Sequence, residues 1–124
     1  MPSTKTPRTR FASWQRHLVA RRFDYTCNLC KNALNTFFTV DHLLPLSVGG
    51  SNSPRNLQVL CNDCNHIKTT IVDEQIRDMF AFEPETKLYR KDVEKMQLTA
   101  YKMQMMLPLP GESRLPLNAA FDLV

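Results

Sequence analysis

Four cysteines constrain this chain more than any other feature. They form two C-x2-C pairs, Cys27 with Cys30 and Cys61 with Cys64, and 30 residues separate the pairs. Each C-x2-C turn directs two sulfur atoms toward one point, so two such turns can complete a tetrahedral four-thiolate zinc site. A site that uses all four cysteines has no open position, which predicts a structural rather than a catalytic ion. Such an ion would add folding free energy to a chain of only 124 residues.

Cysteines used as metal ligands are typical of compartments that keep thiols reduced. No apolar run approaches the ~20 residues of a membrane helix. The N-terminal residues 1–5 carry a charge without the apolar stretch of a secretory signal. We therefore expect an intracellular protein, cytoplasmic or, in a eukaryotic or viral setting, nuclear or in the host cell. It is expected to be neither secreted nor bound to a membrane.

Positive charge is concentrated in the first third of the chain. Residues 1–35 contain seven Lys or Arg and one Asp, residues 36–70 are neutral, and residues 71–124 carry a charge of −2. This asymmetry indicates a polyanionic partner, although a solvated, disordered tail is an equally good interpretation of a basic run alone. Residues 1–12 are therefore predicted to be a basic disordered arm.

Periodicity and breakers predict a small α+β domain flanked by helices. The expected elements are a helix at 14–23, strands at 37–41 and 57–60, helices at 63–68 and about 72–80, and a last helix at 89–107. A proline-rich extended tail is expected at 108–124, and the division into domains follows as 1–12, 13–70, 71–107 and 108–124.

The last helix carries the most regular apolar stripe. Its members follow one another at spacings of four and three: Tyr89, Val93, Met96, Ala100, Met103 and Leu107. This pattern favours a helix folded back on the domain, and a dimer seam or a docking site for a partner protein is the alternative. The chain is thus expected to be a monomer or a homodimer.

Polar residues with catalytic chemistry lie between and just after the cysteine pairs. Asp41 and His42 end the first strand, Asn56 precedes the second, and Asn65 and Lys68 follow Cys64 on one helix face. A carboxylate offers hard oxygen ligands to Mg²⁺, and a histidine can accept a proton from water at neutral pH. Each residue alone is more often an ordinary surface or turn residue, but their joint order between two C-x2-C pairs favours a site.

The stretch from about Cys27 to Lys68 resembles the HNH endonuclease family of the zinc-stapled kind. The shared pattern is C-x2-C, Asp-His followed by a proline and a Gly-Gly loop, then Asn-Leu-x-x-Leu-Cys-x2-Cys-Asn-x2-Lys. The resemblance implies a ββα-metal, treble-clef-like core in which a two-stranded hairpin and a helix grip one Mg²⁺ or Mn²⁺. It also implies hydrolysis of DNA phosphodiester bonds.

Carried over by position, Asp41 is similar to the family's metal ligand and His42 to its general base. Asn56 is similar to the residue that braces the loop and orients the base. Asn65 stands at the third position, where many members have histidine, and would be the second ligand, which makes the chain an H-N-N variant. His66 is a surface or DNA-contacting residue in this interpretation, because adjacent helical residues point about 100° apart.

The resemblance implies that one site nicks one DNA strand and leaves 5′-phosphate and 3′-hydroxyl ends. Candidate contacts to the DNA backbone are the basic residues Arg8, Arg10, Arg16, Arg21, Arg22, Arg55 and Lys68. Two other functions remain open: a non-catalytic zinc-stabilised module for DNA binding or packaging, and a zinc domain of RING-like character that binds proteins. The set of four polar residues in the pattern favours the nuclease.

Overall fold

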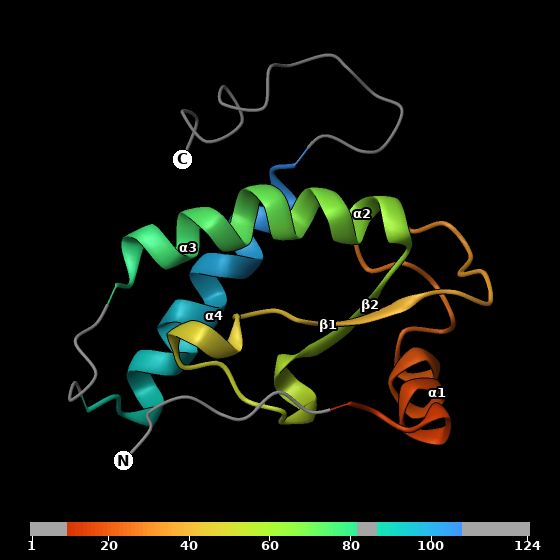
Figure 1. Ribbon diagram of the computed structural model, residues 1–124, viewed down its shortest axis with the longest axis horizontal. Helices are drawn as coiled ribbons and strands as arrows, with labels where there is room; N and C mark the ends of the chain where they lie inside the picture. Colours follow the sequence, from red (N-terminus) through yellow and green to blue (C-terminus); the bar gives the residue numbers. More distant parts are fainter. Residues whose placement is uncertain (1–9, 82–86, 108–124) are drawn as a thin grey trace.

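A computed structural model of the protein describes residues 10–81 and 87–107. Its main elements, labelled in Figure 1, are α1 (Ser13–Arg22), β1 (Thr39–His42), β2 (Leu57–Leu60), α2 (Asn62–Ile67), α3 (Glu74–Met79) and α4 (Arg90–Met105). A π-helical segment, Lys68–Asp73, joins α2 to α3 into one continuous helical rod. Most of the predicted arm, with Arg8, and the predicted tail at 108–124 lie outside the described residues.

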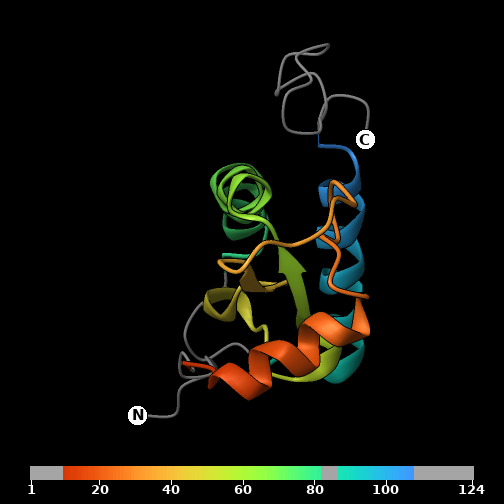
Figure 2. The same cartoon turned by 90° about the vertical axis from the view of Figure 1, so that its right-hand side faces the viewer.

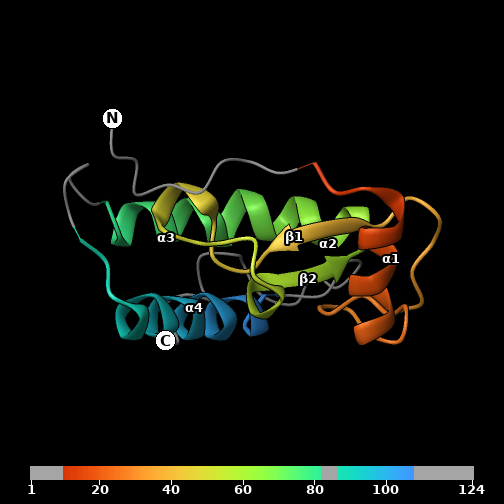
Figure 3. The ribbon, with the colours of Figure 1, turned by 90° about the horizontal axis from the view of Figure 1, so that it is seen from below.

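The two strands form an antiparallel hairpin in which Thr39 pairs with Leu60 and His42 pairs with Leu57. Figures 2 and 3 show this hairpin between two helical layers, the α2–α3 rod on one side and α4 on the other. Helix α1 crosses one end of the hairpin. The predicted α+β class with a small ββα core is confirmed. The predicted helix 14–23 and strand 57–60 each begin and end within two residues of α1 and β2.

The loop between the strands turns sharply at the Gly-Gly pair. Gly49 has a φ of 104°, a left-handed value that disfavours any side chain. A Cβ atom on Gly50 would lie 1.9 Å from the carbonyl oxygen of Leu44. Both glycines are therefore required for the loop to fold back against the end of β1.

Helix α4 folds back on the domain, as its apolar stripe favoured. The buried members of the stripe belong to the same core cluster as both cysteine pairs and the α2–α3 rod: Met96, Ala100, Met103 and Leu107. Only Tyr89, at the start of the stripe, is largely exposed. The segments predicted as a nuclease domain and a helical extension thus share one core.

A second, smaller core cluster holds α1 against the hairpin. Val19 and Ala20 of α1 pack on Phe38, Leu57 and Val59. Within the described ranges, no helix is both long enough and apolar enough to cross a membrane.

Candidate functional site

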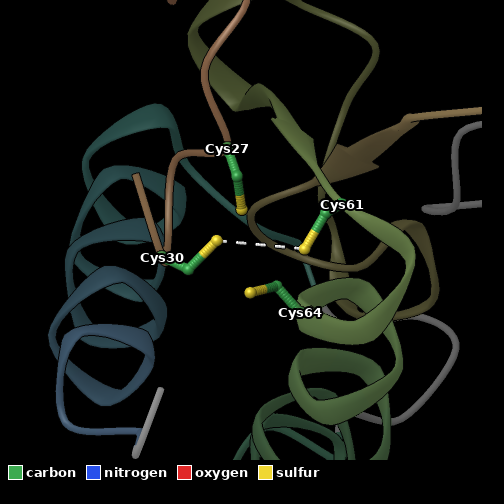
Figure 4. Close-up of side chains that lie close together, drawn as sticks. All are labelled: Cys27, Cys30, Cys61 and Cys64. Atoms are coloured by element: carbon green, nitrogen blue, oxygen red, sulfur yellow. Dashed lines mark hydrogen bonds between the residues drawn. The ribbon is translucent and has the colours of Figure 1, made fainter. Parts of the chain in front are cut away.

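The four cysteines converge on one point between the base of the hairpin and the start of α2, as Figure 4 shows. Their sulfur atoms all lie within 4.8 Å of one another, and Cys30 Sγ is 3.9 Å from Cys61 Sγ. Four sulfurs around a tetrahedral zinc, each about 2.3 Å from the ion, would be about 3.8 Å apart. The cluster therefore fits a metal ion such as zinc.

Backbone groups around the cluster favour the thiolate of Cys27. Burial would raise the pKa of the Cys27 thiol, but hydrogen bonds from the backbone at Cys61, Cys30 and Leu29 lower it to about 7. The Leu29 amide lies 3.4 Å from Cys27 Sγ. Burial and the neighbouring cysteines raise the pKa of Cys64. A bound cation would offset that cost, because it stabilises the deprotonated form.

A separate pocket of about 270 Å³ opens beside the end of β1. Asp41 and His42 from the hairpin and Asn65 from α2 all line it. Side chains on a strand alternate between faces, but Asp41 and His42 lie where the strand ends and the backbone turns. The three side chains, 24 residues apart at their extremes, thus face one space.

Asp41 is held through one of its two oxygens. Its Oδ2 lies 2.8 Å from Lys68 Nζ and accepts a hydrogen bond of 2.9 Å from Gln58 Nε2. Among the described residues, none bonds Oδ1. One oxygen is therefore anchored, and the other remains available to a ligand in the pocket.

Lys68 is fully buried and occupies the centre of a charged cluster. Besides Asp41, its Nζ lies 2.7 Å from Asp73 Oδ1 and donates to the carbonyl oxygen of His42 at 2.6 Å. Residues five apart on an α-helix lie about 140° apart around its axis. The π-helical segment Lys68–Asp73 closes its bonds over five residues, which brings Asp73 round to Lys68.

Burial of this cluster changes the pKa of Asp73. Desolvation raises its pKa to about 6, although the charge and hydrogen bond of Lys68 act in the opposite direction. Lys68 thus lies between two carboxyl groups. When Asp73 is protonated, Asp41 is the neighbour that balances the positive charge of the amine.

The His42 ring is oriented by Asn52 in the loop between the strands. His42 Nε2 lies 2.8 Å from Asn52 Oδ1. An amide oxygen only accepts hydrogen bonds, so Nε2 must carry the proton and Nδ1 has the free lone pair. The ring of Phe11 lies 6.1 Å from the His42 ring and covers one side of the pocket. The His42 tautomer with its proton on Nε2 is the one that lets Nδ1 accept a proton.

Asn65 and His66 differ in the way that helix geometry predicts. Asn65 is half-buried and lines the pocket, and its side chain has no hydrogen-bond partner among the described residues. His66 is exposed and is not part of the pocket lining. Of these two residues, Asn65 is therefore the one whose side-chain oxygen can reach a ligand in the pocket.

Asn56 is fully buried and ties the loop to the end of β1. Its Oδ1 accepts from the Leu44 amide at 2.8 Å, and its Nδ2 donates to the carbonyls of Leu44 and Ser51 at 3.0 and 2.8 Å. These bonds go to backbone rather than to His42. Asn56 therefore fixes the path of the loop that carries Asn52.

Comparison with protein families matches residues 27–81 to a family model described as HNH endonuclease. The matched segment begins at the first cysteine of the cluster and contains every residue of the pocket described above except Phe11. This match supports the assignment of residues 27–81 to the HNH endonuclease family. No curated protein and no solved structure gave a significant match. The match suggests a nuclease.

The basic residues expected to contact DNA have different surroundings in the structure. Arg10, Arg21 and Arg55 are exposed. Arg22 is exposed and donates to the carbonyl oxygen of Pro54. Arg16 donates to the carbonyl oxygen of Phe38 and stacks 4.7 Å from that ring's centre.

Lys68 does not fit its predicted place among the DNA contacts. A side chain with no exposed surface and two carboxylate neighbours cannot reach a backbone phosphate. The pattern Asn-x2-Lys places it on the correct helix, but its amine points inward to Asp41.

Four residues of the HNH site escaped the sequence analysis: Asn52, Gln58, Asp73 and Gln104. Gln58 lies directly opposite Asp41 in the hairpin, so the register of the two strands could have indicated it. The other three have no spacing or composition that distinguishes them from surface polar residues.

Proposed function

We propose that the chain is a metal-dependent DNA endonuclease that hydrolyses phosphodiester bonds and nicks one strand per active site. The observation that carries this proposal is that Asp41, His42 and Asn65 line one pocket within the segment that belongs to the HNH family. A module that only binds DNA needs neither an oriented histidine nor two oxygen donors beside it.

The donors suit a hard divalent cation. Asp41 Oδ1 and the amide oxygen of Asn65 would hold Mg²⁺ or Mn²⁺, which prefer oxygen ligands. Such an ion supplies electrostatic stabilisation for the negative charge that develops on a scissile phosphate. Lys68 and Gln58 hold Asp41 by its other oxygen, so the carboxylate does not have to reorganise when it binds.

His42 acts as the general base in this proposal. Its Nδ1 accepts a proton from a water molecule, while Nε2 remains bonded to Asn52. The oxygen of that water forms a bond to phosphorus, and the bond from phosphorus to the 3′-oxygen breaks. The 3′-oxygen takes a proton from solvent, and the products are a 5′-phosphate and a 3′-hydroxyl. A double-strand break then needs a second subunit or a second encounter.

The rest of the domain supports this site in two ways. The four-cysteine cluster holds a structural zinc that fixes the base of the hairpin against α2. Four exposed arginines contact the DNA backbone without reading its sequence: Arg10, which precedes α1, Arg21 and Arg22 of α1, and Arg55 of the loop.

Nicking of a supercoiled plasmid tests the proposal. The zinc-loaded protein is incubated with plasmid in Mg²⁺, in Mn²⁺ and in EDTA, together with the His42→Ala and Asn65→Ala variants. We expect open-circular product with either ion and none with EDTA, and a loss of at least 100-fold in rate for both variants. Plasmid that stays supercoiled with the wild-type protein would instead favour the non-catalytic DNA-binding function.

His66→Ala is the matched comparison, because His66 is adjacent to Asn65 and lies outside the pocket. This variant should retain the chemical step. Loss of nicking in His66→Ala together with full activity in Asn65→Ala would transfer the ligand role to His66.

A further inference from the structure

Helix α4 reaches the pocket through a pair of buried glutamines. Gln104 of α4 and Gln58 of β2 have 0% and 2% of their surface exposed. Gln58 Nε2 donates to Gln104 Oε1 at 2.7 Å, and Gln104 Nε2 donates back to Gln58 Oε1 at 2.8 Å. The two amides thus form a closed, reciprocal pair between the hairpin and a helix that lies outside the matched segment 27–81.

The Gln58 amide has its full complement of bonds. Its second N–H donates to Asp41 Oδ2 at 2.9 Å, and its oxygen also accepts from Asn28 Nδ2 at 2.9 Å. A side-chain amide has two donor hydrogens and two acceptor lone pairs, so all four are used. Turning the amide over would set its oxygen against the Asp41 carboxylate and its nitrogen against Asn28. Only one orientation of Gln58 satisfies all three neighbours.

The neighbours of Gln58 come from three parts of the fold. Asn28 lies between Cys27 and Cys30 in the four-cysteine cluster, and its backbone N–H donates to the Val59 carbonyl. Gln104 comes from α4, and Asp41 is the residue directly opposite on β1. A second contact of the same kind joins Gln97 of α4 to Asn56, at 3.1 Å. The helix therefore bonds both to the partner of Asp41 and to the residue that fixes the loop.

We propose that Gln58 is a positioning residue for the metal ligand Asp41, and that Gln104 of α4 holds Gln58 in the orientation this requires. The proposal rests on the proposed function, because it takes Asp41 to be a metal ligand. Gln58 and Lys68 both contact Oδ2, which leaves Oδ1 as the oxygen that Asp41 can offer to the pocket it lines. Helix α4 is in this view part of the active centre and not an accessory to the HNH domain.

The test is a cycle of isosteric substitutions, Gln58→Met, Gln104→Met and the double variant, with the exposed Gln75→Met of α3 as the matched control. Mn²⁺ binding to the zinc-loaded protein is measured from the loss of the electron paramagnetic resonance signal of free Mn²⁺. Unfolding in urea is measured on the same samples. Removing the partner of a metal ligand typically weakens metal affinity 10- to 100-fold. We expect about 10-fold weaker binding for Gln58→Met, several-fold for Gln104→Met and no change for Gln75→Met.

The double variant separates positioning from simple stabilisation. If Gln104 acts only through Gln58, the double variant binds Mn²⁺ no more weakly than Gln58→Met alone. Each single substitution leaves a buried amide of the pair without its partner and lowers stability. The double variant removes both amides of the pair, but it leaves Asn28 and Asp41 without Gln58, as Gln58→Met does. The double variant should therefore be more stable in urea than Gln58→Met and still bind Mn²⁺ about 10-fold more weakly than the wild type. A merely structural pair would give metal affinities that follow stability.

Three results overturn the proposal: wild-type Mn²⁺ affinity in the double variant, losses of affinity that are fully additive, or no Mn²⁺ binding by the wild-type protein. The first two leave the proposed nuclease untouched, since its own test is plasmid nicking. The third removes the metal-dependent nuclease as well. The protein could also bind Mn²⁺ with an affinity that responds to the substitutions and yet nick no plasmid. That result would retain the positioning role of Gln58 and refute only the proposed nuclease function.

Discussion

The buried amine of Lys68 gives the strongest quantitative prediction. Lys68→Met removes the amine that lies between Asp41 and Asp73, at 2.8 and 2.7 Å from their oxygens, and also a donor to the His42 carbonyl. Breaking a buried ion pair by deleting one partner typically costs about 3–5 kcal/mol, because the other charge stays buried without compensation. Two carboxylates and one carbonyl lose their partner here, so we expect a loss near the upper end of that range.

This loss is measured as the change in free energy of unfolding in urea, at pH 7.5 and with zinc retained. Lys95→Met, on the exposed face of α4, is the matched control and should change stability by no more than about 0.5 kcal/mol. Adding Asp73→Asn to Lys68→Met removes one uncompensated charge and should restore about 1–3 kcal/mol. A Lys68→Met protein within about 1 kcal/mol of the wild type would refute the reasoning, because the cluster would then contribute nothing to the fold.

Three further predictions concern the groups around the pocket. Asn52→Asp sets a carboxylate beside His42 Nε2, which favours the charged imidazole, so the acidic limb of the pH–rate profile for nicking should shift about one unit upward; an unchanged profile would contradict the assignment of His42 as the base. Cys64→Ser should abolish binding of one zinc per chain, measured by metal analysis, and should unfold the domain, whereas a folded zinc-free variant would contradict a structural ion. Burial raises the folded pKa of Asp73 to about 6 from 3.8, so wild-type stability contains a contribution that is present below about pH 4 and is lost as the pH rises toward and through 6. Asp73→Asn lacks this titration, so its stability relative to the wild type, compared in urea at pH 5 and pH 7.5, should increase with pH, and equal differences at both values would refute the shift.

The sequence predicted those features that follow from fixed spacing. Two C-x2-C turns can meet only if the chain between them returns to its start, which predicts that this segment folds back. The family resemblance implied that it does so as a two-stranded hairpin followed by a helix. The stripe of α4 predicted a buried face because apolar residues repeat at the period of a helix. The shared pocket of Asp41, His42 and Asn65 agrees with the order of residues in the family pattern.

The features that the sequence did not predict depend on contacts between distant residues. Lysine is among the residues that are least often buried, so nothing in the sequence indicated that Lys68 has no exposed surface. Gln104 is 46 residues from Gln58 and adjacent to the buried Met103, where a polar residue normally faces solvent. The π-helical segment adds to this difficulty, because one widened turn changes which residues of the α2–α3 rod share a face.

A chain of hydrogen bonds connects the cysteine cluster to the pocket. A structural ion is usually credited only with global stability, yet Asn28 lies inside the first C-x2-C turn and bonds Gln58, whose other N–H bonds Asp41. Any shift of that turn therefore also moves the partner of Asp41, the proposed metal ligand. The same amide is held from the opposite side by α4. Because Gln58 can satisfy all its neighbours in one orientation only, the cysteine cluster and α4 act on Asp41 jointly, and the loss of either should loosen the same carboxylate.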